Sequence, residues 1–119
     1  MIILVFILMS SPCSAQWDKT EKAMFIAHST IRAIDMLQTN DIYHKDEYHE
    51  LNPMIDWGVN QMGTKFIPIW FVGIGVVEYI LLDQLSHNHR KIGLGALTAL
   101  GLGVVCHNNS IGLGLNFSF

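Results

Sequence analysis

Charge is scarce in this chain. Only 14% of its 119 residues are charged, and seven Lys and Arg residues stand against ten Asp and Glu residues, a formal net charge of −3. A nucleic-acid interface needs clustered cations that neutralise phosphates, and the sequence holds no such cluster. We therefore expect no nucleic-acid partner.

Cysteines and nucleophile motifs are almost absent as well. The two cysteines are Cys13 and Cys106, and there is no CxxC, no Gly-x-Ser-x-Gly and no phosphate-binding loop. A single cysteine left after removal of the first residues could form no internal disulfide, and Cys106 then fits a small apolar helix residue. These absences argue against an enzyme, and we expect no cofactor.

Hydrophobic residues, in contrast, make up 50% of the chain, which is high for one small soluble domain. The apolar run at 2–9, followed by Cys13, Ser14 and Ala15, is typical of a secretory signal peptide cleaved after Ala15. It is too short to cross a membrane, which takes about 20 residues. The sequence thus predicts a signal peptide at 1–15 and one domain at 16–119.

The first predicted helix, at 18–39, starts at a capping box of Asp18 and Glu21 and contains neither Gly nor Pro. Helical spacing gathers its polar residues on one face and its alanines and isoleucines on the other. That polar face is either a groove for a ligand or a solvated surface; its residues are Glu21, His28, Arg32, Asp35 and Thr39.

A charged connection at 40–64 follows, with a short helix expected at 53–60 that begins at Pro53 and is capped by Asn52. The segments 66–82 and 92–105 predict two apolar helices that form a hairpin around "SHNHRK". The second carries a small-xxx-small ridge, which favours helix pairing in lipid; it consists of Gly95, Ala99 and Gly103. The alternating tail from 111 to 119 predicts an edge strand or an extended arm.

Glu78 lies near the middle of the most apolar segment, where an ionisable group is costly and needs a partner. Arg32 is the partner that fits by residue type, provided that the polar face of the first helix is turned inward. A solvent-facing Glu78 is the alternative.

The loop at 44–50 offers a different chemistry, because histidines beside carboxylates suit a divalent metal such as zinc. The candidate ligands are His44, Asp46, His49 and Glu50. Their spacing matches no metal-site template, so a solvated loop stays open beside the metal site. The group formed by Asp83, His87, His89 and Arg90 offers a second, weaker cluster, since cations at a helix end also complement its dipole.

Three short motifs carry a resemblance. The sequences "DMLQT" at 35–39, "ELNP" at 50–53 and "NNSIG" at 108–112 resemble a group of small membrane proteins from tailed phages and bacteria. The resemblance implies a helical membrane protein without an assigned activity, encoded by a phage or a bacterium, and implies no catalytic residues. The motif positions able to form a polar cluster are Asp35, Gln38, Thr39, Glu50, Asn52, Asn108 and Ser110.

Together these patterns predict an all-α inner-membrane protein that acts by binding, or by a structural role, in the cell envelope. We expect the helix at 18–39 and the tail in the periplasm and the cationic "HNHRK" in the cytoplasm. The expected partners are membrane lipid, a second copy or another envelope protein. Two alternatives are a metal-dependent hydrolase built on the 44–50 loop and a soluble helical domain that forms oligomers. The expected polar site consists of the seven motif residues with His28, Arg32 and Glu78.

Overall fold

The computed structural model describes residues 16–119, which form four helices and no strand. They are α2 (Lys19–Ile42), α3 (Pro53–Met62), α4 (Phe66–Asp83) and α5 (His87–Ser110). The predicted all-α fold is therefore confirmed. The predicted signal peptide at 1–15 lies outside the described residues.

The two predicted helix starts are formed as expected. The Asp18 carboxylate accepts the backbone N–H of Glu21 at 2.8 Å, and the Glu21 carboxylate accepts the N–H of Asp18 at 2.9 Å, which completes the capping box of α2. Asn52 caps α3 by accepting the N–H of Met54 at 3.0 Å. Pro53 occupies the first turn of α3, where a backbone N–H has no acceptor within the helix, so the missing N–H of proline costs no hydrogen bond.

The hairpin of α4 and α5 is tighter than the sequence suggests. The prediction that residues 86–91 form a linker is wrong, because α5 already begins at His87 with Ser86 as its N-cap. Histidine, asparagine and arginine are all tolerated in a first helical turn. Arg90 also gains a buried position inside the helix, so the connection shrinks to residues 84–86.

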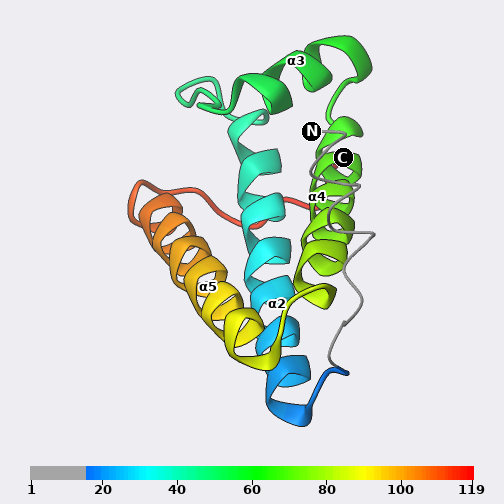
Figure 1. The fold of residues 1–119 in the computed structure, drawn as a ribbon. Helices are drawn as coiled ribbons and strands as arrows, with labels where there is room; N and C mark the ends of the chain where they lie inside the picture. Colours follow the sequence, from blue (N-terminus) through cyan, green and yellow to red (C-terminus); the bar gives the residue numbers. More distant parts are fainter. Residues whose placement is uncertain (1–15) are drawn as a thin grey trace.

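The three long helices lie side by side (Figure 1). α2 stands between α4 and α5, and α5 packs mainly against α2. α2 and α5 run in the same direction, α4 runs opposite to both, and α3 crosses the end of the bundle where α2 finishes. The apolar core is small and lies where α3 meets α4; it consists of Ile55, Ile67 and Phe71.

The tail forms an extended arm, one of the two predicted possibilities, and the strand alternative does not form. The arm lies along the C-terminal half of α2, where the Asn116 N–H donates to the Leu37 carbonyl at 3.3 Å. Of the alternating apolar residues of the arm only Leu113 is buried, while Ile111, Leu115, Phe117 and Phe119 stay exposed. The described residues offer no strand with which the tail could pair, so the alternating pattern does not lead to a buried face.

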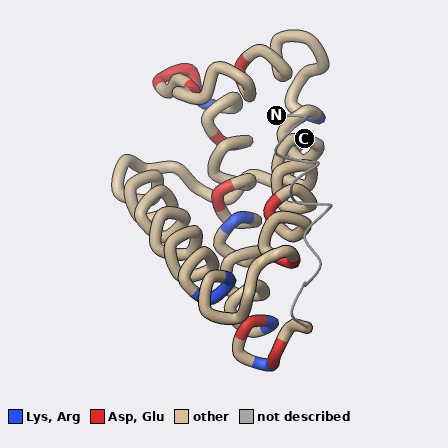
Figure 2. The backbone as a smooth tube through the Cα atoms, in the orientation of Figure 1, with Lys and Arg blue, Asp and Glu red and all other residues tan. Residues whose placement is uncertain are grey.

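Polar and apolar residues are distributed in an unusual way. The buried residues of the described chain include Glu21, His28, Gln38 and Arg90, while large apolar side chains along α4 and α5 face outward. After Lys91, α5 carries no Lys, Arg, Asp or Glu residue (Figure 2). Both α4 and α5 are long and apolar enough to cross a membrane, judged by length and composition.

The two ends of the bundle are clearly distinguished. The start of α2 lies beside the α4–α5 turn, because Glu21 is ion-paired to Arg90. The tail packs against the other half of α2. From the sequence, the first helix and the tail were predicted to lie on one side of the membrane and the 86–91 segment on the other. In the structure α2 and α5 run parallel, so the start of α2 lies beside the start of α5 and away from the tail (Figure 1).

Candidate functional site

A triad of ionisable side chains links α2 to α4 in the middle of the bundle. Glu78 of α4 is ion-paired with Arg32, and its Oε2 lies 2.6 Å from Nε2 of His28. The predicted pairing of Glu78 with Arg32 is thus confirmed, and the polar face of α2 is turned inward. The triad borders a cavity of about 200 Å³ between the two helices. Two of its atoms, His28 Nδ1 and Arg32 Nε, are buried without a hydrogen-bond partner.

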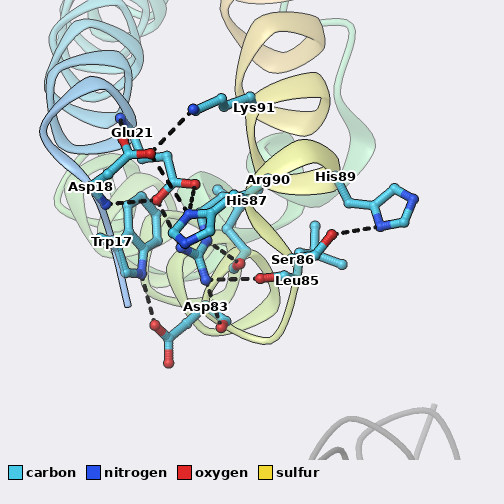
Figure 3. Close-up of polar contacts among 11 residues, drawn as sticks. Trp17, Asp18, Glu21, Asp83, Leu85, Ser86, His87, His89, Arg90 and Lys91 are labelled. Atoms are coloured by element: carbon cyan, nitrogen blue, oxygen red, sulfur yellow. Dashed lines mark hydrogen bonds and ion pairs between the residues drawn. The ribbon is translucent and has the colours of Figure 1, made fainter. Parts of the chain in front are cut away.

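A second cluster joins the start of α2 to the α4–α5 turn (Figure 3). Arg90 is fully buried and bonds to Glu21 at 2.9 Å, while the guanidinium lies 4.6 Å from the Trp17 ring. It also donates to the last carbonyls of α4 and to the turn that follows, at Leu82, Asp83 and Leu85. We call this group the Arg90 staple, because one side chain holds three segments together.

Asp18, Glu21 and His87, at the edge of the Arg90 staple, bring three potential metal-ligand atoms within 4.8 Å of one another. The surrounding groups already use these atoms. His87 Nδ1 lies 2.6 Å from Glu21, Lys91 lies 3.1 Å from Asp18, and the Arg90 guanidinium bonds to Glu21. The positive charges of Arg90 and Lys91 would repel a metal cation here, so the arrangement suits an internal ion-pair network better than a metal centre.

A third polar cluster fixes the tail to the end of α2. Asp41 accepts the N–H of Gly114 at 2.7 Å and pairs with Lys45 at 2.8 Å. Asn40 donates to the Asn116 carbonyl at 3.0 Å. Burial raises the pKa of Asp41, but hydrogen bonds from Lys45, Gly114 and Asn116 outweigh it, and the net pKa lies below the ordinary 3.8.

A partly open cavity of about 770 Å³ lies inside the described chain, and we call it the α2–α5 cavity. It lies between α2, α5 and the segment 48–55, and its volume falls in the range of ligand pockets. Its polar lining consists of Arg32, Asp35, Thr39, Tyr48, His49, Glu50, Asn52, His107 and Asn108. Its apolar lining includes Leu51, Ile55, Trp70, Phe71, Leu100 and Val104.

Two groups that line this cavity have no partner among residues 16–119. The Asp35 carboxylate makes no hydrogen bond or ion pair with any described residue, and neither does the hydroxyl of Thr39, a residue that is only 4% exposed. Asp35 and Glu50 line the same cavity, so their two carboxyl groups face one space.

The structure gathers most of the predicted polar site around the α2–α5 cavity. Asp35, Thr39, Glu50, Asn52 and Asn108 all line it, although they come from three separate sequence motifs. Gln38 reaches its edge, where its Oε1 accepts a hydrogen bond from Asn108 at 3.2 Å.

The remaining predicted residues lie elsewhere. Ser110 is exposed, and its hydroxyl donates to the carbonyl of His107 in the last turn of α5. His28 and Glu78 belong to the neighbouring smaller cavity, and Arg32 borders both cavities.

The four candidate metal ligands of the loop do not come together within the described chain. Three ligand atoms within 4.8 Å are found at Asp18, Glu21 and His87, and not among residues 44–50. His44 turns back onto α2, with its Nδ1 2.8 Å from the Asn40 carbonyl, while Glu50 accepts the N–H of Asn52. The metal hypothesis stays a prediction from residue types, and this geometry lends it no support.

Sequence reasoning missed the residues that hold the bundle together. Asn40 and Asp41 follow the "DMLQT" motif directly, yet nothing in their spacing indicated that the tail would return to them. Arg90 was assigned to a helix-end cluster, but its burial depends on Trp17 and Glu21, far away in the sequence. The basic pair Arg90 and Lys91 beside an apolar hairpin is the signal that the sequence offers for it.

Comparison with known proteins adds no further guide. No protein-family model, no curated protein and no solved structure matches this chain.

Proposed function

We propose that this chain is a small inner-membrane protein of the cell envelope that acts by binding a ligand in the α2–α5 cavity. The observation that carries the proposal is a roomy cavity lined by partnerless polar groups, inside a bundle whose exterior is apolar. Buried polar groups without partners cost free energy, so their retention is best explained by a ligand that completes them.

The membrane part of the proposal rests on the outer surface of α4 and α5. Exposed apolar side chains follow both helices, among them Val72, Val76, Ile80, Leu100 and Leu102. Exposed apolar side chains in such number along two helices are rare on soluble monomers and indicate contact with lipid or with a partner. A soluble oligomer is the alternative, and the carbonate extraction described below decides between the two.

The proposed topology follows from the Arg90 staple. If α4 and α5 cross the bilayer, the start of α2 and the α4–α5 turn share one side, since Glu21 and Arg90 are in direct contact. The connection at 43–65, at the far end of the bundle, then lies on the opposite side. A cleaved signal peptide would make the first of these sides periplasmic.

The resemblance of the three motifs to small phage and bacterial membrane proteins supports the same proposal, because five of the seven motif positions line the cavity. A phage-encoded binding protein of the envelope could act in lysis or in the exclusion of other phages. This extension rests on the resemblance alone.

Membrane integration and topology are tested together. The protein should stay in the membrane pellet after extraction with alkaline carbonate. For topology, both native cysteines are replaced by alanine, and single cysteines are introduced at the exposed positions Lys19, Asn88 and Glu47. We expect a membrane-impermeant maleimide to label Lys19→Cys and Asn88→Cys from the same side and Glu47→Cys from the other.

Two results would contradict the proposal. Release of the protein by carbonate would establish the soluble alternative. Labelling of Lys19→Cys and Asn88→Cys from opposite sides would restore the topology predicted from the sequence, and it would break the link between the staple and the membrane. Labelling after detergent permeabilisation serves as the control that each cysteine is reactive.

A further inference from the structure

The charges around the α2–α5 cavity are not balanced. Arg32 is the only Lys or Arg residue in the lining, and its guanidinium is already paired with Glu78. Asp35 and Glu50 face the same space without an ion-pair partner among the described residues. The cavity is therefore acidic, and a cation placed between these two carboxylates would relieve their repulsion.

The walls indicate what kind of cation would fit. Trp70, Phe71 and Tyr48 are the aromatic residues of the cavity lining. Aromatic faces attract organic ammonium groups, whose carbon substituents also gain from apolar contact. A metal ion would need several ligand atoms at close range, and the described residues of the cavity do not provide such a group.

The cavity also continues towards the outside of the bundle. Leu100 and Val104 of α5 line it and are at the same time exposed on the apolar outer surface. An alkyl chain could lie over these two residues while its head reached the carboxylates. The buried Thr39 hydroxyl, without a partner among residues 16–119, offers a further hydrogen bond to the head.

We infer that the α2–α5 cavity binds the ammonium group of an amphiphile, with Asp35 and Glu50 as counter-charges and Trp70, Phe71 and Tyr48 as the aromatic wall. The inference rests on the proposed function, since it names the ligand class of the same cavity. The ammonium group can come from a lipid with an amino headgroup or from a soluble amine.

The test uses the purified full chain in a non-ionic detergent. A long-chain alkylammonium that carries bromine close to its head group should quench the fluorescence of Trp70 on binding, and the alkyl sulfate with bromine at the same position should not. Trp70→Phe identifies the part of the quenching that comes from the cavity. Asp35→Asn should weaken ammonium binding by about tenfold to a hundredfold, the loss expected for one charge-assisted hydrogen bond.

A matched pair of variants keeps the test independent of folding defects. Glu50→Gln changes a loop carboxylate that lines the cavity, whereas Glu47→Gln changes an exposed carboxylate of the same loop that does not. We expect Glu50→Gln to weaken binding and Glu47→Gln to leave it unchanged. Circular dichroism establishes that each variant is folded.

Competition distinguishes the two sources of the ammonium group. Displacement of the probe by phosphatidylethanolamine, and not by phosphatidylglycerol or short-chain butylammonium, identifies a lipid. Displacement by butylammonium as well identifies a soluble amine. Equal binding of the sulfate probe, or unchanged binding in both Asp35→Asn and Glu50→Gln, overturns the inference. Such a result would refute the ammonium ligand without contradicting the proposed membrane topology, so the two proposals are tested independently.

Discussion

The Arg90 staple allows the sharpest test of the fold. Arg90→Met replaces a fully buried guanidinium by an apolar side chain of similar length, while Glu21 keeps its buried carboxylate. Removing one partner of a buried ion pair costs about 3–5 kcal/mol, because the remaining charge is left uncompensated. The substitution also removes the donors to the carbonyls of Leu82 and Asp83, at the end of α4.

The neighbouring residue supplies the matched control. Lys91 pairs with Asp18 at 3.1 Å, but both side chains are 40% exposed, whereas those of Arg90 and Glu21 are 0% exposed. An exposed pair contributes about 0–1 kcal/mol. Lys91→Met should therefore lower the free energy of unfolding several times less than Arg90→Met, although each substitution removes one positive charge.

The assay is reversible unfolding in mixed micelles, in which SDS is titrated into a maltoside detergent and helix content is followed by circular dichroism. A double-mutant cycle with Glu21→Gln isolates the coupling between the two side chains. The double variant should be more stable than the sum of the single losses predicts. Equal losses for Arg90→Met and Lys91→Met would refute the assignment of Arg90 as the buried link between helices.

Two further predictions concern the other polar clusters. Glu78→Gln leaves Arg32 without its counter-charge and weakens the bond to His28. Because the Arg32 side chain is 30% exposed, the free energy of unfolding in the same assay should fall by only about 1–3 kcal/mol, and an unchanged stability would argue against the triad. The contact of Asp41 with the tail should depend on pH. Because the folded-state pKa of Asp41 lies below its ordinary 3.8, the carboxylate stabilises the fold above pH 3.8, and this contribution is lost as the pH falls through the lowered value. Proteolysis of the tail by an acid-active protease should therefore accelerate at low pH, and Asp41→Asn should remove that pH dependence.

Local signals in the sequence predicted the helices well. Capping residues such as Asp18 and Asn52 fix a helix start through bonds to their own neighbours, so their effect can be derived from spacing alone. The 86–91 segment was misjudged because its polar composition suggested a loop. The helix forms there because of a tertiary contact: once the first turn of α5 is helical, Arg90 is buried against Trp17 and Glu21.

The glycine ridge of α5 illustrates the same limit. Its spacing predicts close helix pairing, yet in this chain a side chain added at Gly95 or Gly103 would meet no atom within 4 Å. The close approach to α2 occurs instead at Gly101, where an added Cβ would lie 2.9 Å from Ile31. Periodicity identified a surface able to pair, but it could not identify which face α2 would use.

The sequence predicted most of the residues of the candidate site, but it did not predict how they come together around one cavity. The three motifs marked Asp35, Glu50 and Asn108 as polar positions in an apolar chain, and their convergence requires the return of α5 alongside α2. That return depends on the parallel packing of two helices separated by three connections. No local spacing encodes it.

The distribution of unpaired polar groups separates structural clusters from the candidate site. The acidic groups of the Arg90 staple are paired within the chain, as is Asp41 at the base of the tail. On α2, the buried or half-buried polar groups that lack a partner in the described chain are His28 Nδ1, Arg32 Nε, Asp35, Thr39 and Asn40 Oδ1. All belong to one stretch of α2, and Arg32, Asp35 and Thr39 border the α2–α5 cavity. Asp35 and Thr39 have no partner at all in the described chain, and for these two stability alone would favour apolar replacements, because an unpaired buried polar group costs about 1–3 kcal/mol. Their placement along one cavity is therefore best accounted for by a ligand that forms the missing bonds.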